Sequence, residues 1–134
     1  MNRRGQRGAS VVEFAIILPL VVWLIFGIME IAFVLYDKTM ITHASREGAR
    51  AGVIFRVPAV PDEEIIEVVN DYLGTSLITF GEPQTATVIV TRDGSSAGDR
   101  LKVTVSYTYT ALVFSLASMG KKFNMVSETT MRME

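Results

Sequence analysis

The chain has 134 residues, of which 49% are hydrophobic, and its formal net charge is −1. That length is enough for one modest domain, and the near-neutral charge points to no class of partner. No cysteine is present, which excludes disulfides and thiolate metal sites. The basic residues are scattered without an aromatic–basic patch, so we predict no nucleic-acid partner.

The N-terminal third is predicted to anchor the chain in a membrane. Residues 1–8, MNRRGQRG, form a short basic leader peptide that we expect to lack regular structure. Residues 14–36 then carry a single charge, and a helix of that length, about 34 Å, can cross a hydrocarbon core of about 30 Å. The run is longer than the apolar part of a secretory signal, so we interpret it as a retained transmembrane segment. Because three arginines precede it, the N-terminus is predicted to be cytoplasmic and residues 38–134 to lie outside.

We predict one long helix over residues 9–57 that continues well past the membrane. Pro19 should loosen it locally, and the two prolines of RVPAVP (56–61) should end it. Beyond the membrane, small residues recur every three or four positions and form one narrow face: Ala44, Gly48, Ala51 and Gly52. Residues 58–134 are predicted to form an extracytoplasmic α+β domain.

A short amphipathic helix and a small sheet are predicted within that domain. Residues 61–74 begin with Pro61 and three acids and end with Gly74. Their apolar stripe is Ile65, Val68, Val69 and Tyr72, widened by Ile66 and Leu73. Apolar and polar residues alternate in 85–92 and 101–110, which predicts an antiparallel hairpin joined by DGSSAGD; 123–134 is a candidate third strand. Residues 111–120 fit a short helix or an apolar loop. The fold class is therefore α+β and pilin-like, with the apolar face of the sheet packed on the helices.

Two acids stand out in the apolar run. Glu13 either sits at the headgroup level at little cost, or pairs with a group on another subunit. Glu30 is deeper. It is either a snorkelling carboxylate near the outer interface or a polar contact to another helix, with Gly27 allowing close approach. The two acids lie about 100° apart around the helix, so they are not a paired acid–base site.

The stretch HASREGAR, residues 43–50, places charged side chains on one side of the helix. One interpretation is a solvated face with His43–Glu47 and Glu47–Arg50 pairs. The other is a juxtamembrane interaction surface made by Arg46, Glu47, Gly48 and Arg50, with the arginines binding acidic groups of a neighbouring subunit or lipid headgroups. One histidine and no cysteine argue against catalysis and against a metal site, so we predict no enzyme and no cofactor.

Residues 3–53 strongly resemble the TadE-like family, the minor pseudopilins of tight-adherence (Flp-type) pilus systems. The features that match, in this order, are Gly8, the run Val12–Glu13–Phe14–Ala15, Pro19, Gly27, Glu30 and residues 44–50. The resemblance implies processing by a prepilin peptidase between Gly8 and Ala9, at a site that includes Glu13 and Phe14. Helix packing during assembly would involve Glu13, Pro19, Gly27 and Glu30.

The processed chain would start at Ala9, and Glu13 would lie one helical turn further on. Its carboxylate could then pair with the amine of a neighbouring subunit. The implied partners are the membrane, the prepilin peptidase, sister pilins and the assembly platform, without nucleic acid or a small-molecule substrate. The implied location is the bacterial inner membrane, as a subunit that joins, primes or caps a filament, or that serves a related secretion pseudopilus. The alternative is a stand-alone single-pass adhesion or receptor module that displays its outer domain.

Overall fold

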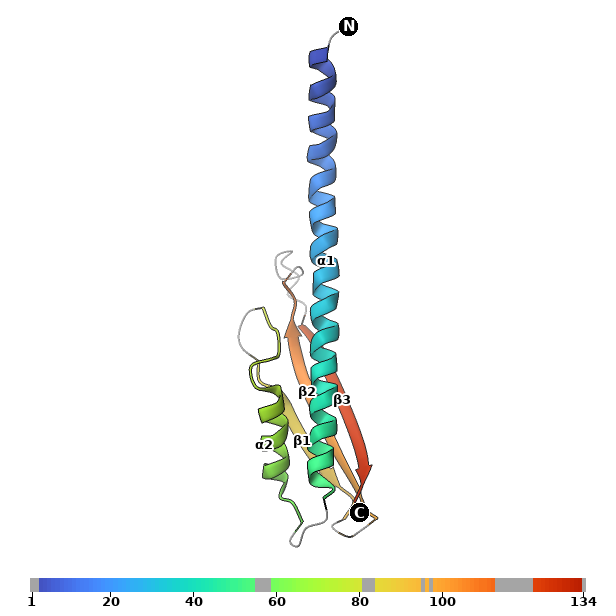
Figure 1. Ribbon diagram of the computed structural model, residues 1–134, viewed down its shortest axis with the longest axis vertical. Coiled ribbons are helices and arrows are strands. Elements are labelled where there is room, and N and C mark those ends of the chain that lie inside the picture. Colours follow the sequence, from blue (N-terminus) through green and yellow to red (C-terminus); the bar gives the residue numbers. More distant parts are fainter. Residues whose placement is uncertain are drawn as a thin grey trace.

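The computed structural model describes residues 3–54, 59–80, 84–94, 96, 98–112 and 122–133, with side chains from residue 10 onward. It contains a long helix, α1 (Arg3–Gly52), a short helix, α2 (Asp62–Leu73), and three strands, β1 (Thr87–Arg92), β2 (Arg100–Thr110) and β3 (Lys122–Arg132). The N-terminal part of α1 protrudes alone, and its C-terminal part lies with α2 on the sheet (Figure 1). The predicted α+β fold class is confirmed.

Helix α1 differs from its predicted bounds at both ends. It starts at Arg3, so residues 3–8 of the leader are helical rather than irregular, and it ends at Gly52, before the predicted end at residue 57. It continues through Pro19, although proline has no backbone N–H to donate. Figure 1 shows it as one straight column. The helix that leaves the domain is therefore the same continuous element that packs inside it.

The sheet has the order β1-β2-β3, and both neighbouring pairs are antiparallel. Val88 lies opposite Val105 in the first pair, and Tyr107 lies opposite Met125 in the second. The predicted hairpin and the third strand are confirmed. The alternation in β2 is complete, with every second side chain at most 1% exposed: Leu101, Val103, Val105, Tyr107 and Tyr109. Of the segment 111–120, only residues 111 and 112 lie within the described part of the chain.

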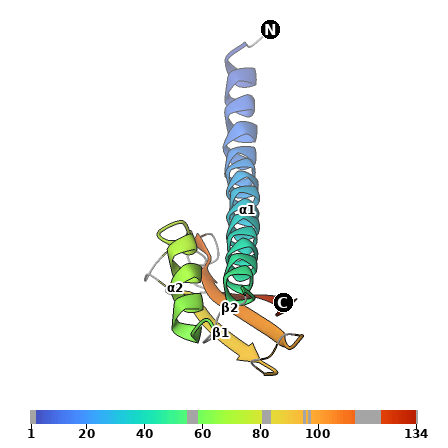
Figure 2. The same ribbon diagram turned by 60° about the horizontal axis from the view of Figure 1, so that its bottom comes forward.

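Helix α2 packs beside α1 on the same sheet (Figure 2). Its buried residues are Ile65, Val69 and Leu73, spaced by one turn each. Tyr72 is 43% exposed, so its predicted place in the apolar stripe is wrong: the stripe continues through Leu73. Pro61 is the residue before the helix, with extended backbone, rather than its first residue.

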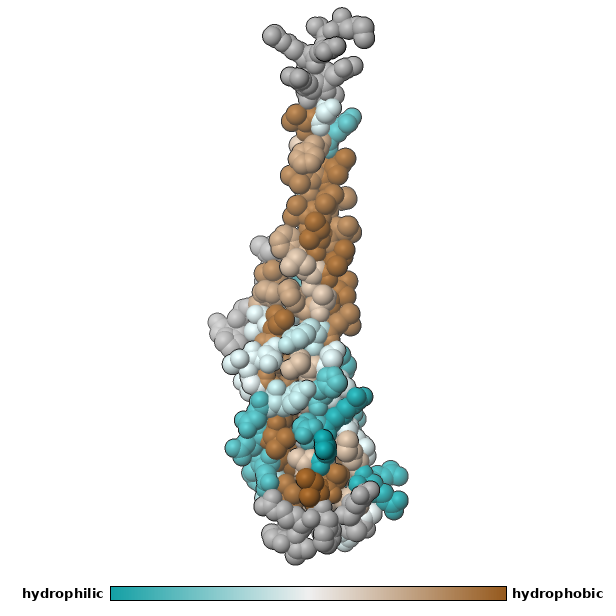
Figure 3. Space-filling model, in the orientation of Figure 1, coloured by the Kyte–Doolittle hydropathy of each residue, from teal (hydrophilic) through white to brown (hydrophobic). Residues whose placement is uncertain are grey.

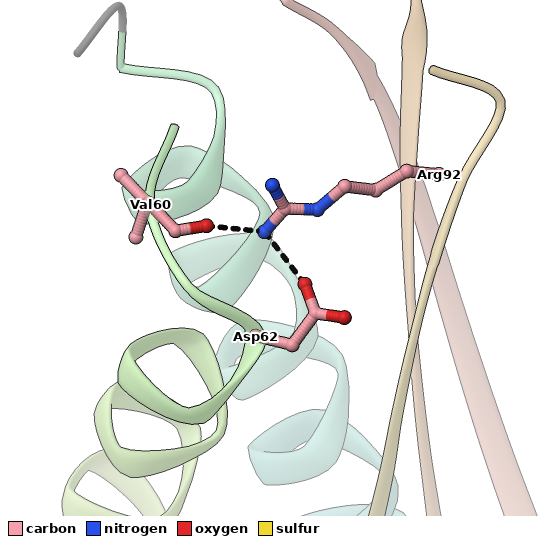
Figure 4. Close-up of polar contacts among 3 residues, drawn as sticks. All are labelled: Val60, Asp62 and Arg92. Carbon is pink, nitrogen blue, oxygen red and sulfur yellow. Dashed lines mark hydrogen bonds and ion pairs between the residues drawn. The ribbon is translucent and has the colours of Figure 1, made fainter. Parts of the chain in front are cut away.

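Arg92 of β1 fixes the start of α2. Its Nη2 lies 2.7 Å from Asp62 Oδ1 and donates to the carbonyl oxygen of Val60 at 2.5 Å. Figure 4 shows the guanidinium between these two oxygens. Pro61 provides no side-chain cap, and Arg92 ties the first turn of α2 to the sheet without capping its N–H groups, because a guanidinium can only donate.

Candidate functional site

The part of α1 that protrudes from the domain is the first candidate. We call Ser10–Met29 the bare segment: its side chains are exposed, except at Gly27, which is partly buried. At 1.5 Å per residue it is about 30 Å long, the thickness of a hydrocarbon core. Figure 3 shows the surface of this half as almost uniformly hydrophobic, in contrast to the mixed surface of the domain. The helix is long and apolar enough to cross a membrane, and none of its apolar window is buried.

Glu13 is the acid of the bare segment. It is exposed, and none of the described side chains forms a hydrogen bond or an ion pair with it. Phe14 and Pro19 are exposed too, and a Cβ added at Gly27 would have nothing within 4 Å. Gly8 and Ala9 lie in helical backbone just before the segment. The structure therefore leaves Glu13, Phe14, Pro19 and Gly27 open to other chains along one continuous helix.

Glu30 marks the point at which the domain begins to hold α1. Its side chain is only 6% exposed, and its Oε1 accepts hydrogen bonds from the Tyr109 hydroxyl at 3.0 Å and the Leu112 N–H at 2.7 Å. It is therefore not the predicted snorkelling carboxylate, and these partners lie in its own domain rather than on another helix. The Phe80 ring packs against both Phe33 and Tyr109, at centroid distances of 5.6 and 6.4 Å, and adds aromatic contacts between α1 and the domain.

Asp37, two helical turns further along α1, is also a buried acid that accepts a backbone N–H from the domain. It is fully buried, and its Oδ1 accepts the Ile78 N–H at 2.9 Å, while the Tyr107 hydroxyl donates to the Ile78 carbonyl at 3.0 Å. Burial raises the pKa of the Asp37 carboxyl, and the Ile78 N–H partly opposes this shift. Burial also raises the pKa of Tyr109, with a further contribution from Glu30. We call Glu30, Asp37, Tyr107 and Tyr109 the acid–tyrosine row.

Sequence reasoning missed the acid–tyrosine row, although a signal was present. Glu30 and Asp37 are seven residues apart and so share a helix face, and Tyr107 and Tyr109 share a sheet face. Glu30 Oε1, Asp37 Oδ1 and both tyrosine hydroxyls have long-range hydrogen-bond partners, whereas Asp37 Oδ2 is buried without one. The row joins the end of the bare segment to β2, so its role is to fix the domain to α1.

Hydroxyl groups fix α1 to β3 below the acid–tyrosine row. Ser45 Oγ lies 2.8 Å from Thr129 Oγ1 and 3.3 Å from Ser127 Oγ, and Ser127 also donates to Thr42 at 3.3 Å. Lys38 Nζ donates to the carbonyl oxygen of Val126. The C-terminal half of α1 is thus held by its own sheet, whereas the bare segment has no such contacts among the described residues.

The predicted juxtamembrane surface divides into two parts. Arg46 and Arg50 are exposed and have no ion-pair partner in the described part of the chain. Glu47 is partly buried, and within the same residues no ion pair joins it to His43 or Arg50, so the expected pairs do not form. Gly48 is buried and faces inward, so it belongs to the packing of α1 on α2 and not to an outer surface.

Gly48→Ala should destabilise the domain by about 1–3 kcal/mol. The new Cβ would lie 2.4 Å from Val69 Cγ2, and Val69 is itself fully buried, so a neighbour has to shift. Gly27→Ala is the matched control, because its Cβ meets open space. Denaturant unfolding of the full chain in detergent compares the two variants, and equal midpoints would contradict the close approach of α1 and α2 at Gly48.

The fold and the bare segment together fit one class of protein: a single-pass membrane protein with an α+β domain fixed to the end of its long apolar helix. The family model described as TadE-like protein matches residues 8–50, which confirms the resemblance found in the sequence. The match covers the bare segment and most of the rest of α1, and it relates the chain to Tad pilus systems. No curated protein and no solved structure matches the chain significantly.

Proposed function

We propose that this chain is a minor pseudopilin-like subunit for the assembly of a tight-adherence pilus or a related secretion pseudopilus. One observation carries the proposal: a membrane-length helix, bearing an acid with no partner among the described residues, protrudes from the domain within the segment that matches the TadE-like family. Such a helix can associate with the helices of sister pilins through close packing and polar contacts. The domain then supplies contacts outside the membrane.

The packing of α1 suggests where the membrane lies. Phe33 and Val34 pack against the core and Asp37 is buried, so the predicted span of 14–36 overlaps the domain. We place the hydrocarbon core at Ser10–Met29 instead, whose length of about 30 Å matches it. Glu30 then lies at the outer interface, where the domain begins. In this placement the N-terminus is cytoplasmic and the domain is extracytoplasmic, as the arginines before the span favour.

Glu13 lies near the cytoplasmic end of this span. Cleavage between Gly8 and Ala9 would leave a charged amine on Ala9, one turn before Glu13. A carboxylate in a span costs free energy, although less near its end than at its centre, and pairing it with the amine of a neighbouring subunit neutralises two charges in a poor solvent. The pair would also set the axial register of one helix against the next.

The prepilin peptidase would have to unwind the first turns of α1, because residues 3–8 are helical. Gly5 and Gly8 ease this step, since each glycine weakens a helix by about 1 kcal/mol relative to alanine. N-terminal sequencing of the chain from its native membrane tests the proposal. We expect a start at Ala9 in cells with the co-resident peptidase and an uncleaved leader in cells without it.

A further inference from the structure

Arg46 and Arg50 form a basic stripe on α1. They are one turn apart, and each lies two residues, or about 200°, around the helix from the buried Gly48. They therefore point away from the core. Both are exposed and neither forms an ion pair within the described part of the chain. The stripe lies beyond the acid–tyrosine row along α1, and so outside the membrane in the proposed placement.

Glu67 and Asp71 form a matching acidic stripe on α2. They too are one turn apart, and each lies two residues after a buried position, Ile65 or Val69, so they also point outward. Both are exposed and have no hydrogen bond or ion pair among the residues described. Asp62 differs, because Arg92 already engages it.

The two stripes lie at the same height along the molecule. A Cβ at Gly52 would meet Ile65, and one at Gly48 would meet Val69, so α1 and α2 run in opposite directions with these positions level. Because the helices are antiparallel, two residues back along α1 are level with two residues forward along α2. Arg50 is therefore level with Glu67, and Arg46 with Asp71. Both stripes also have the same spacing of four residues, about 6 Å. Because each stripe faces outward from its own helix, these charges do not meet within one chain.

We propose that the basic stripe of one chain docks on the acidic stripe of a second copy of this chain, Arg50 on Glu67 and Arg46 on Asp71. This inference rests on the proposed function, since copies anchored by parallel membrane helices stand side by side in that orientation. The contact is heterologous, so it builds a row, a ring or a filament rather than a closed dimer. Exposed ion pairs are weak, so the stripes select the neighbour and its height while the membrane helices supply most of the association.

Disulfide trapping tests the proposal cleanly, because the natural chain has no cysteine. Two full-length copies with different tags are co-expressed, one carrying Arg50→Cys and the other Glu67→Cys, and are oxidised in the native membrane. In the control pair, the first copy carries Thr39→Cys in place of Arg50→Cys. Thr39 lies on the same side of α1 as Arg50 but 11 residues, about 16 Å, away along the helix. We expect at least about tenfold more cross-link for the first pair, since a disulfide needs Cα atoms within about 7 Å. Equal yields, or cross-links only between identical positions, would overturn the proposal.

Charge reversal gives an independent readout by co-purification of the two tagged copies. Arg46→Glu with Arg50→Glu in both copies should reduce recovery of the partner roughly tenfold, and adding Glu67→Arg with Asp71→Arg to the same chains should restore it. Recovery that is unchanged by the first pair of substitutions, or not restored by the second, would contradict docking between the stripes.

Single cysteines around one turn of the bare segment separate this inference from the proposed function: Ile17→Cys, Leu18→Cys, Leu20→Cys and Val21→Cys. A cross-link between helices at one of these positions, without one between residues 50 and 67, would reject the docking of the stripes and leave assembly through the bare segment standing. If no cross-link forms at either place, both the docking of the stripes and the association of bare segments would be rejected for copies of this chain.

Discussion

Replacing Glu13 with leucine is expected to leave the chain in the membrane and to abolish its incorporation into pili or pilus-assembly complexes. Glu13 is exposed and has no partner in the described part of the chain, so its removal costs no internal contact. Leucine also favours insertion, because a carboxylate at the centre of a span costs about 2.5–3.5 kcal/mol and less near its end. What the variant loses is the proposed pair with the amine of a neighbouring Ala9.

Membrane fractionation measures whether the variant stays in the membrane. Pilus counts, or co-purification with sister pilins, measure whether it is incorporated. The mass of each variant is recorded as well, so that a loss of processing is not mistaken for a loss of pairing. Val12→Leu is the control, because Val12 is 59% exposed and carries no charge. Normal pilus levels with Glu13→Leu would show that the pairing role is wrong.

Replacing Glu30 with leucine, in contrast, should destabilise the domain. Glu30→Leu removes the acceptor of the Tyr109 hydroxyl and of the Leu112 N–H. A buried polar group without a partner costs about 1–3 kcal/mol, so we expect the domain to lose roughly 2–5 kcal/mol of stability. Denaturant unfolding of the full chain in detergent measures this loss, and Glu13→Leu serves as the control with unchanged stability.

Tyr109→Phe separates the hydrogen bond that Glu30 accepts from Tyr109 from the one that it accepts from Leu112. It removes the hydroxyl and keeps the bond from Leu112, so we expect a smaller loss, about 1–2 kcal/mol. Combined with Glu30→Leu it should add little, because the two groups share one interaction. Wild-type stability of Glu30→Leu would mean that Glu30 faces lipid or another helix after all.

Local periodicity was sufficient to predict the elements of the fold. The strict alternation of residues 101–110 predicted the buried face of β2, and the apolar run after Glu13 predicted the protruding helix. Both follow from a repeat that the backbone imposes on neighbouring residues. The placement of Tyr72 failed, because the helical repeat allows either of two adjacent residues at the end of α2 to be the buried one, and Leu73 is buried.

The contacts of the site depended on pairings that no local pattern contains. Glu30 binds the hydroxyl of a tyrosine 79 residues away, and Lys38 reaches a carbonyl 88 residues away. Gly48 was assigned both to the face of small residues and to the juxtamembrane surface, and the position of α2 turns it inward, which agrees with the first assignment only. The candidate residues of the bare segment rest on the family resemblance and stay predictions, whereas the exposed apolar helix that carries them followed from composition, because that part of α1 has few tertiary contacts to override the pattern.

The identity of the mature N-terminus is the first measurement that the proposed function calls for. Intact mass and N-terminal sequencing would be applied to the chain from its native membrane, with and without the prepilin peptidase, beside a variant whose cleavage site is altered at Gly8. We predict a start at Ala9 that requires both the peptidase and Gly8, which would supply the charged amine that the proposed pair with Glu13 needs. A start at Met1 or Asn2 in the presence of the peptidase would contradict it, and would leave a permanently anchored membrane protein that displays its outer domain.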